Sequence, residues 1–123
     1  MGCDIHLYIE YQKKGINDWK IFGDEFRLPR DYDMFGILAR VRNKTKYSFK
    51  PKGIPTDFSE INIANVPDYH SHSWLNYFEF SEAVAQYEKY YGNCYLEYRI
   101  IEEILLKFDV ELFPARVVFW FDN

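Results

Sequence analysis

The last segment of the chain, residues 116–122, restricts the possible folds more than any other stretch. It reads RVVFWFD, and its middle is apolar and aromatic without interruption. A short run of this kind is typical of a central strand that is covered on both faces of its sheet. We therefore expect the end of the chain to form the middle of the fold.

The first segment, residues 3–11, has the pattern of a strand with one buried face. Apolar and polar residues alternate in CDIHLYIEY, so that Asp4, His6, Tyr8 and Glu10 share the polar side. A chain of 123 residues has little room for two cores. The first and last strands are therefore expected in one sheet, with Arg116 or Asp122 near Asp4 and His6.

The segments between the two ends alternate in type. Residues 13–18 predict a turn and residues 19–26 a returning strand, which together complete a hairpin. Helices are predicted after Asp33, after Ser81 with Ser81 as the capping residue, and over residues 96–108. A long polar loop is expected at about residues 43–67, as a candidate lid. The chain is thus predicted to be a single α+β domain over residues 1–123, with a mostly antiparallel sheet and two to three helices packed on one face.

Charge and hydropathy exclude several classes of function. The net charge is −4 and the pI is about 5.3, whereas a duplex nucleic acid requires a basic face. A small anionic ligand stays possible, because a few arginines can create a local positive field. No apolar run is long enough to span a membrane, and the opening MGCDIH lacks the Ser or Thr of a myristoylation motif. We expect a cytoplasmic protein in which Cys3 and Cys94 are small buried thiols.

The three histidines form the densest group of chemically active side chains. His6 follows Asp4 by two residues, and His70 and His72 stand two apart in DYHSHSW. In an extended chain, residues i and i+2 point to the same side, about 6–7 Å apart. These spacings predict one shared site built from Asp4, His6, His70 and His72, although each histidine alone is more often a packed structural residue.

Aromatic and basic residues near these segments are candidates for contacting a ligand. Aromatics make up 20% of the chain, an excess that favours a groove or an oligomer interface. The candidates for stacking are Tyr8, Tyr32 and Trp74, and those for binding phosphate are Arg30, Arg42 and Arg116. Asp122 is added because a charged residue directly after an apolar strand lies at the rim of the sheet.

Four blocks of the sequence resemble a family of small proteins from bacteriophages and bacteria. They read MGCDIH at the start, RDYDMFGILARVRN, HSHSWL in the middle and RVVFWFDN at the end, so the resemblance covers nearly the whole chain. In that family the second block begins RNYD, whereas Asp31 stands at its second position here. The family has no settled activity. Small phage proteins often block host defence, so the resemblance implies a host nucleotide signal as a ligand, met in the host cytoplasm.

Three chemistries fit the predicted site. Asp4, His6, His70 and His72 could bind a divalent metal such as zinc, manganese or iron. Alternatively, His6 and one of the pair act as a metal-free general acid and base on a phosphodiester. In the third interpretation the protein is a non-catalytic sponge, most naturally an oligomer, that sequesters a nucleotide. The sequence favours a phosphodiesterase-like hydrolase acting on a nucleotide-like phosphate ligand, with the sponge as the alternative.

Overall fold

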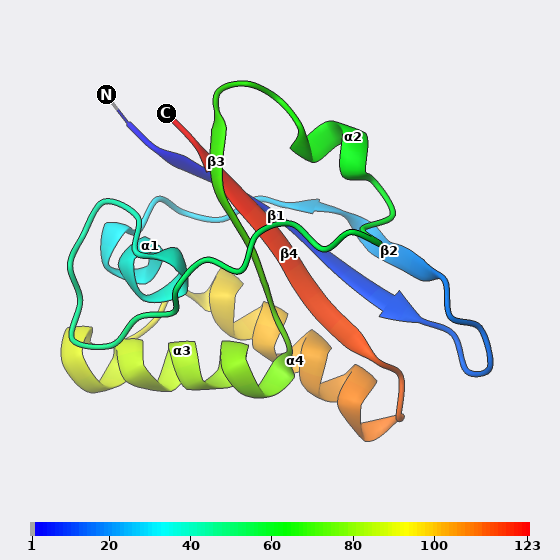
Figure 1. Ribbon diagram of the computed structural model, residues 1–123. Helices are drawn as coiled ribbons and strands as arrows, with labels where there is room; N and C mark the ends of the chain where they lie inside the picture. Colours follow the sequence, from blue (N-terminus) through cyan, green and yellow to red (C-terminus); the bar gives the residue numbers. More distant parts are fainter. Residues whose placement is uncertain (1) are drawn as a thin grey trace.

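The four strands form one antiparallel sheet in the order β2-β1-β4-β3 (Figure 1). The computed structural model describes residues 2–123. The strands are β1 (Asp4–Gln12), β2 (Trp19–Phe26), β3 (Tyr69–Leu75) and β4 (Ala115–Asp122). β4 lies between β1 and β3 and is buried along its middle. The predictions of a central last strand, of one sheet holding both ends of the chain and of a β1–β2 hairpin are confirmed.

Three helices cover one face of this sheet: α1 (Tyr32–Ala39), α3 (Tyr77–Tyr91) and α4 (Leu96–Val110). Their apolar residues pack with Ile5, Leu7 and Ile9 of β1 and with Val117, Phe119 and Phe121 of β4 in the main core. Alternation along each strand explains this, because every second side chain points to the helix face. The α+β class predicted from the sequence is confirmed.

The helix starts follow from capping chemistry. Asp31 caps α1, since its side chain accepts a hydrogen bond from the backbone N–H of Met34. Asparagine, which stands at this position in the family that the sequence resembles, can make the same cap. The predicted start of the next helix was wrong. α3 begins at Tyr77 because Asn76 and Glu79 form a reciprocal capping box ahead of Ser81.

The opposite face of the sheet is covered by the segment that the sequence predicted as a long polar loop. Residues 41–60 have no regular secondary structure, and the short helix α2 (Ile61–Ala64) follows them. Phe58 and Ala64 are buried against Val118 and Trp120 in a second, smaller apolar cluster. This part of the segment is therefore packed down on the sheet. Within the described residues, no helix is both long and apolar enough to cross a membrane.

Candidate functional site

His6 lies on the face opposite the three large helices, between two carboxylates. Its Nδ1 is 2.9 Å from Glu25 Oε1, and its Nε2 forms a hydrogen bond with Asp122 Oδ2. Glu25 reaches His6 through an irregularity in the hairpin, where Leu7 pairs with Phe26 but Ile9 pairs with Phe22. β2 thus has two extra residues at this point. We call His6, Glu25 and Asp122 the His6 cluster.

Both ring nitrogens of His6 face carboxylate oxygens, which accept hydrogen bonds when ionised. Two such acceptors are satisfied together only when both nitrogens carry a proton. Burial lowers the pKa of His6, but the hydrogen bonds to Asp122 and Glu25 and the charges of those carboxylates raise it by more. The pKa of His6 therefore lies above the ordinary histidine value, which favours the imidazolium form of the ring.

The surroundings of the His6 cluster are largely acidic and aromatic. Asp4 lies on the same face, as its spacing predicted, and binds Arg30 with 2.7 Å between Oδ1 and Nε. That hydrogen bond holds the pKa of Asp4 below its usual value. Tyr8 donates to Glu25 over 3.3 Å, and burial together with the charge of Glu25 raises the pKa of Tyr8 to about 12. Arg30 is thus paired with a carboxylate, and Tyr8 is a hydrogen-bond donor to the cluster.

The predicted convergence of His70 and His72 is wrong. Between His70 and Ser73 the strand β3 holds one residue more than β4, since these two residues pair with Phe121 and Phe119. Ser71 takes the left-handed conformation at this bulge, with φ of 56°. A bulge redirects the side chains that follow it. His70 therefore contacts Phe121 of the main core, whereas His72 stacks on Trp120 of the second cluster.

Each of these two histidines has a local structural role. His72 Nε2–H donates to the carbonyl of Ala64 over 2.6 Å, which fixes α2 to the sheet. His70 Nε2 binds the side-chain oxygen of Asn123, and its Nδ1 lies 3.0 Å from the hydroxyl of Ser71. Neither histidine joins the His6 cluster.

The four-residue metal site predicted from the histidine spacings is not assembled. Asp4 and His6 share one face with His72, but His70 pairs with Phe121 and lies on the other. Across residues 2–123, no group of three or more His, Cys, Asp or Glu side chains is placed to hold a metal ion. His6 and His72 both stack on Trp120, with ring centroids 6.0 and 5.8 Å from that of the indole, and the two-histidine acid–base pair stays a prediction.

Arg116, a predicted phosphate contact, is committed to a buried ion-pair network. Its Nη2 lies 2.8 Å from Glu10 Oε1 and 3.0 Å from Asp57 Oδ1. Its guanidinium carbon is 3.8 Å from the centre of the Trp19 ring. Glu10 in turn accepts hydrogen bonds from the backbone and hydroxyl of Ser59. This network attaches residues 57–59 to the sheet and pairs Arg116 with two carboxylates.

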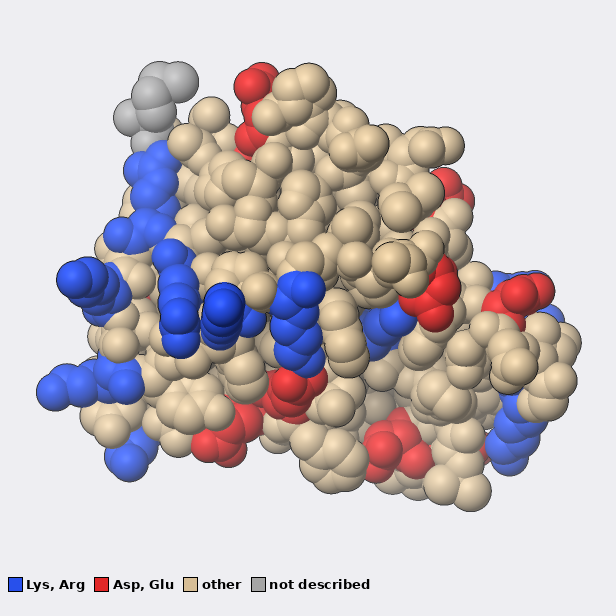
Figure 2. Space-filling model, viewed as in Figure 1, with Lys and Arg blue, Asp and Glu red and all other residues tan. Residues whose placement is uncertain are grey.

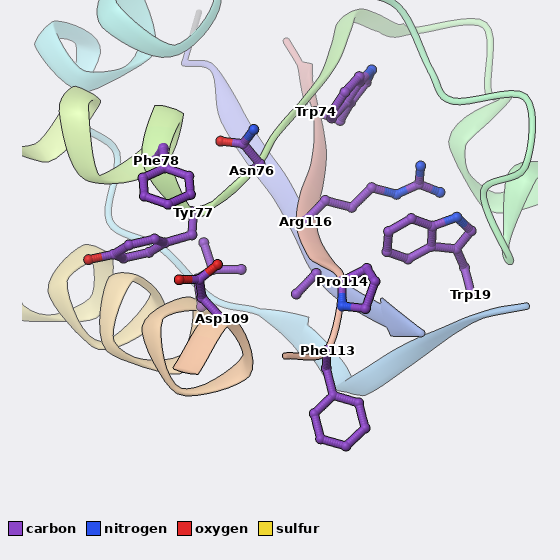
Figure 3. A pocket seen from close by; sticks show the side chains of 11 residues that line it. Trp19, Trp74, Asn76, Tyr77, Phe78, Asp109, Phe113, Pro114 and Arg116 are labelled. Atoms are coloured by element: carbon purple, nitrogen blue, oxygen red, sulfur yellow. The ribbon is translucent and has the colours of Figure 1, made fainter. Parts of the chain in front are cut away.

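Trp74 and Arg116 line a pocket of about 380 Å³ where β4 meets the start of α3 and the end of α4 (Figure 3). Its walls are mainly aromatic: Trp19, Trp74, Tyr77, Phe78 and Phe113. Lys52 covers one face of the Trp74 ring at 3.8 Å and is itself paired with Glu79. The pocket also contains the carboxylate of Asp109. This lining suits an apolar group better than a phosphate.

The remaining predicted contacts, Tyr32 at the start of α1 and Arg42 after its end, lie together. The guanidinium of Arg42 lies 5.3 Å from the centre of the Tyr32 ring, and Tyr32 accepts a hydrogen bond from the backbone of Cys3. Cys3 and Cys94 are free and buried, as predicted.

Arg42 belongs to a longer stretch that sequence reasoning passed over. Residues 34–56, the basic segment, contain no Asp or Glu but six cationic residues: Arg40, Arg42, Lys44, Lys46, Lys50 and Lys52. All six are exposed. In the part of the chain that the structure describes, only Lys52 of these six forms an ion pair. The absence of acidic residues between Asp33 and Asp57 was readable from the sequence and is the signal that could have located this surface.

Comparisons with protein-family models, with curated proteins and with solved structures found no match to this chain. The resemblance to the phage and bacterial family therefore stays a prediction.

Proposed function

We propose that this protein binds a nucleotide-like phosphate ligand on its basic segment and holds it without cleaving it. The observation that carries the proposal is the basic segment itself, which concentrates six of the 15 Lys and Arg residues in a chain of net charge −4. Five of the six have no carboxylate partner among residues 2–123. Unpaired cations give a local positive field that attracts phosphate.

The cationic side chains are gathered in space as well as in sequence. Figure 2 shows Lys and Arg side chains in a band over the side where Figure 1 places α1 and the chain that follows it. Aromatic rings lie within the same region, since Tyr32 packs with Arg42 and Tyr47 packs against Phe49. A base can stack on such rings while the cations bind its phosphates.

The histidines support holding in preference to cleavage. General acid–base cleavage of a phosphodiester needs two proton-transferring groups within reach of one substrate. His70 lies on the helix face, His72 donates to the carbonyl of Ala64, and the two ring nitrogens of His6 face Glu25 and Asp122. Proton transfer from His6 to a substrate would require one of these two hydrogen bonds to break, so the phosphodiesterase that the sequence favoured becomes the second candidate.

One observation keeps that second candidate in place. The His6 side chain is 20% exposed and borders a pocket of about 310 Å³ that also contains Arg27. A protonated His6 is a suitable general acid, and Arg27 is a cation with which a phosphate can pair. Both candidates concern the same class of ligand and differ in turnover.

The deciding experiment incubates catalytic amounts of protein with excess cyclic dinucleotides and mononucleotides, the nucleotide signals that the phage resemblance favours. The sponge proposal predicts binding with recovery of intact ligand after heat release, in a fixed ratio to protein. Product formation that His6→Gln slows by roughly 10²–10⁴-fold would instead establish the hydrolase. If no nucleotide binds, both candidates fail.

We extend the proposal to assembly, because exposed apolar side chains on a helix surface are a candidate interface between two copies of the chain. α4 leaves Leu96 65% and Ile100 46% exposed on its outer surface. The neighbouring Arg99 and Glu103 carry opposite charges, so two antiparallel copies of this helix are self-complementary. Ile100→Glu should shift the mass measured by light scattering to that of the monomer, and an unchanged mass would exclude this interface.

A further inference from the structure

A pocket of about 320 Å³ lies at the end of α1, inside the basic segment. Its lining consists of Gly36, Arg40, Asn43, Lys44, Thr45 and Ser48. Two cations, two hydroxyl groups and one amide thus face one cavity, and none of the lining residues is acidic. This is the donor set that phosphate oxygens require, since every one of these side chains can donate a hydrogen bond.

The pocket exists because the loop after α1 folds back on the helix. Arg40 ends α1 in the left-handed conformation, with φ of 59°, and its N–H donates to the carbonyl of Gly36. At Gly36 the loop approaches so closely that an added Cβ would lie 2.6 Å from the carbonyl oxygen of Asn43 and 2.7 Å from Cγ2 of Thr45. Only glycine permits this approach, so Gly36 sets the shape of the cavity.

The loop is tied down on both sides of the pocket. The backbone N–H of Phe49 donates to Ile37 over 2.8 Å, and the hydroxyl of Thr45 donates to the carbonyl of Tyr47 over 2.6 Å. Arg40 Nε donates to the hydroxyl of Ser48 over 3.2 Å. These bonds fix the positions of the donors before a ligand arrives, which lowers the entropic cost of binding.

Two donors in this pocket still have capacity for a ligand. A guanidinium has five N–H groups, and only the Nε–H of Arg40 is used within residues 2–123, by Ser48. Lys44 forms no ion pair within the same residues. One carboxylate contacts the loop from outside the pocket lining: Asp33 accepts a hydrogen bond from the side-chain amide of Asn43 over 3.0 Å.

The end of α1 opposes an anion only weakly. A helix carries about half a negative charge at its C-terminus. Here the carbonyls of Phe35, Gly36 and Ile37 already accept hydrogen bonds from Val41, Arg40 and Phe49. Two full positive charges at the pocket exceed the remaining partial charge.

We propose that this pocket binds a phosphate group, as a phosphomonoester or phosphodiester, through Arg40, Lys44 and Ser48. The inference deepens the proposed function and rests on it, because it assigns the phosphate of the nucleotide-like ligand to one cavity within the basic segment. A volume of about 320 Å³ holds a phosphate together with part of the sugar that carries it.

The test follows backbone amide signals of residues 43–48 by NMR during titration with inorganic phosphate and with adenosine monophosphate, at constant ionic strength. Adenosine without phosphate is the ligand control. The double variant Arg40→Gln with Lys44→Gln removes both pocket cations. Lys13→Gln with Lys20→Gln is the matched control, since it removes the same charge from the β1–β2 hairpin. Gly36→Ala keeps every charge but forces the loop away from α1.

The proposal predicts that phosphate and adenosine monophosphate shift these amides, that adenosine does not, and that the pocket variant weakens binding at least about tenfold. The hairpin variant should bind within about twofold of wild type at constant ionic strength, because its cations are remote from the pocket. Gly36→Ala should weaken binding while its circular dichroism stays native, and if it unfolds, the charge variants decide alone. An equal loss of affinity in both charge variants, or an unchanged affinity in the pocket variant, would overturn the proposal that this pocket binds phosphate. The proposed function fails separately, when wild-type protein binds no nucleotide at all.

Discussion

Glu10 on β1 and Arg116 on β4 lie directly opposite each other, and both side chains are buried in an ion pair. Their side chains are 0% and 8% exposed. Two charges removed from water are costly unless each is fully paired. Ser59, Asp57 and Trp19 complete the pairing here, so the loop over the second face and the ion pair depend on each other.

Removing one member of this pair should therefore destabilise the folded protein much more than removing both. We expect Glu10→Gln or Arg116→Met to lower the free energy of unfolding by about 3–5 kcal/mol, and Glu10→Leu combined with Arg116→Met to recover most of it. Urea denaturation gives the values. Asp57→Asn is the control, because the Asp57 side chain is 63% exposed and its loss should cost about 1 kcal/mol or less. Single variants as stable as wild type would show that the pair is solvated.

His72 is expected to contribute to stability and not to chemistry. His72→Ala removes the hydrogen bond to Ala64 and the stacking on Trp120, which together should cost about 1–3 kcal/mol in urea denaturation. His70→Ala should cost less, since its partner Asn123 is exposed at the end of the chain. Nucleotide binding should persist in both variants. Loss of nucleotide binding in a folded His72→Ala variant would show that His72 belongs to the ligand site.

The raised pKa of His6 predicts how stability depends on pH. The folded protein binds the His6 proton more tightly than the unfolded chain, whose histidine has its ordinary pKa of about 6.5. The stabilisation is therefore complete below that value and is lost as the pH rises through the folded pKa.

His6→Gln should consequently lower stability more at pH 6 than at pH 9. Denaturation of both proteins at several pH values gives the difference, and NMR titration of the His6 ring locates the folded pKa independently. A difference that widens towards high pH would show that His6 is neutral in the folded protein.

The sheet was predictable because its signals are strong and local. β4 is the only long aromatic and aliphatic run near the C-terminus, and β1 alternates without a fault, so their burial followed from period and length. The contact between His6 and Asp122 then followed from the pairing of these strands.

The histidine site was not predictable because one extra residue in β3 moves the side chains that follow it to the opposite face of the sheet. Nothing in HSHSW shows that Ser71 adopts positive φ, a conformation that glycine or asparagine would have suggested. Glu25 was missed for a related reason, since it reaches His6 through the irregular pairing of β2. Arg40 and Lys44 were missed because the sequence interpretation considered single arginines and not the total charge of the basic segment.

The last prediction concerns salt, which separates the basic segment from the aromatic pocket as the place where a nucleotide binds. Exposed cations act through a field that is screened over about 10 Å at 0.1 M salt and about 3 Å at 1 M. The affinity for adenosine monophosphate should therefore fall steeply between 50 and 500 mM sodium chloride, as measured by calorimetry. Lys46→Gln with Lys50→Gln should flatten this dependence, because both side chains are exposed and unpaired within the described residues. An affinity that does not change with salt and is lost in Trp74→Ala would instead place the ligand in the pocket between β4 and α3.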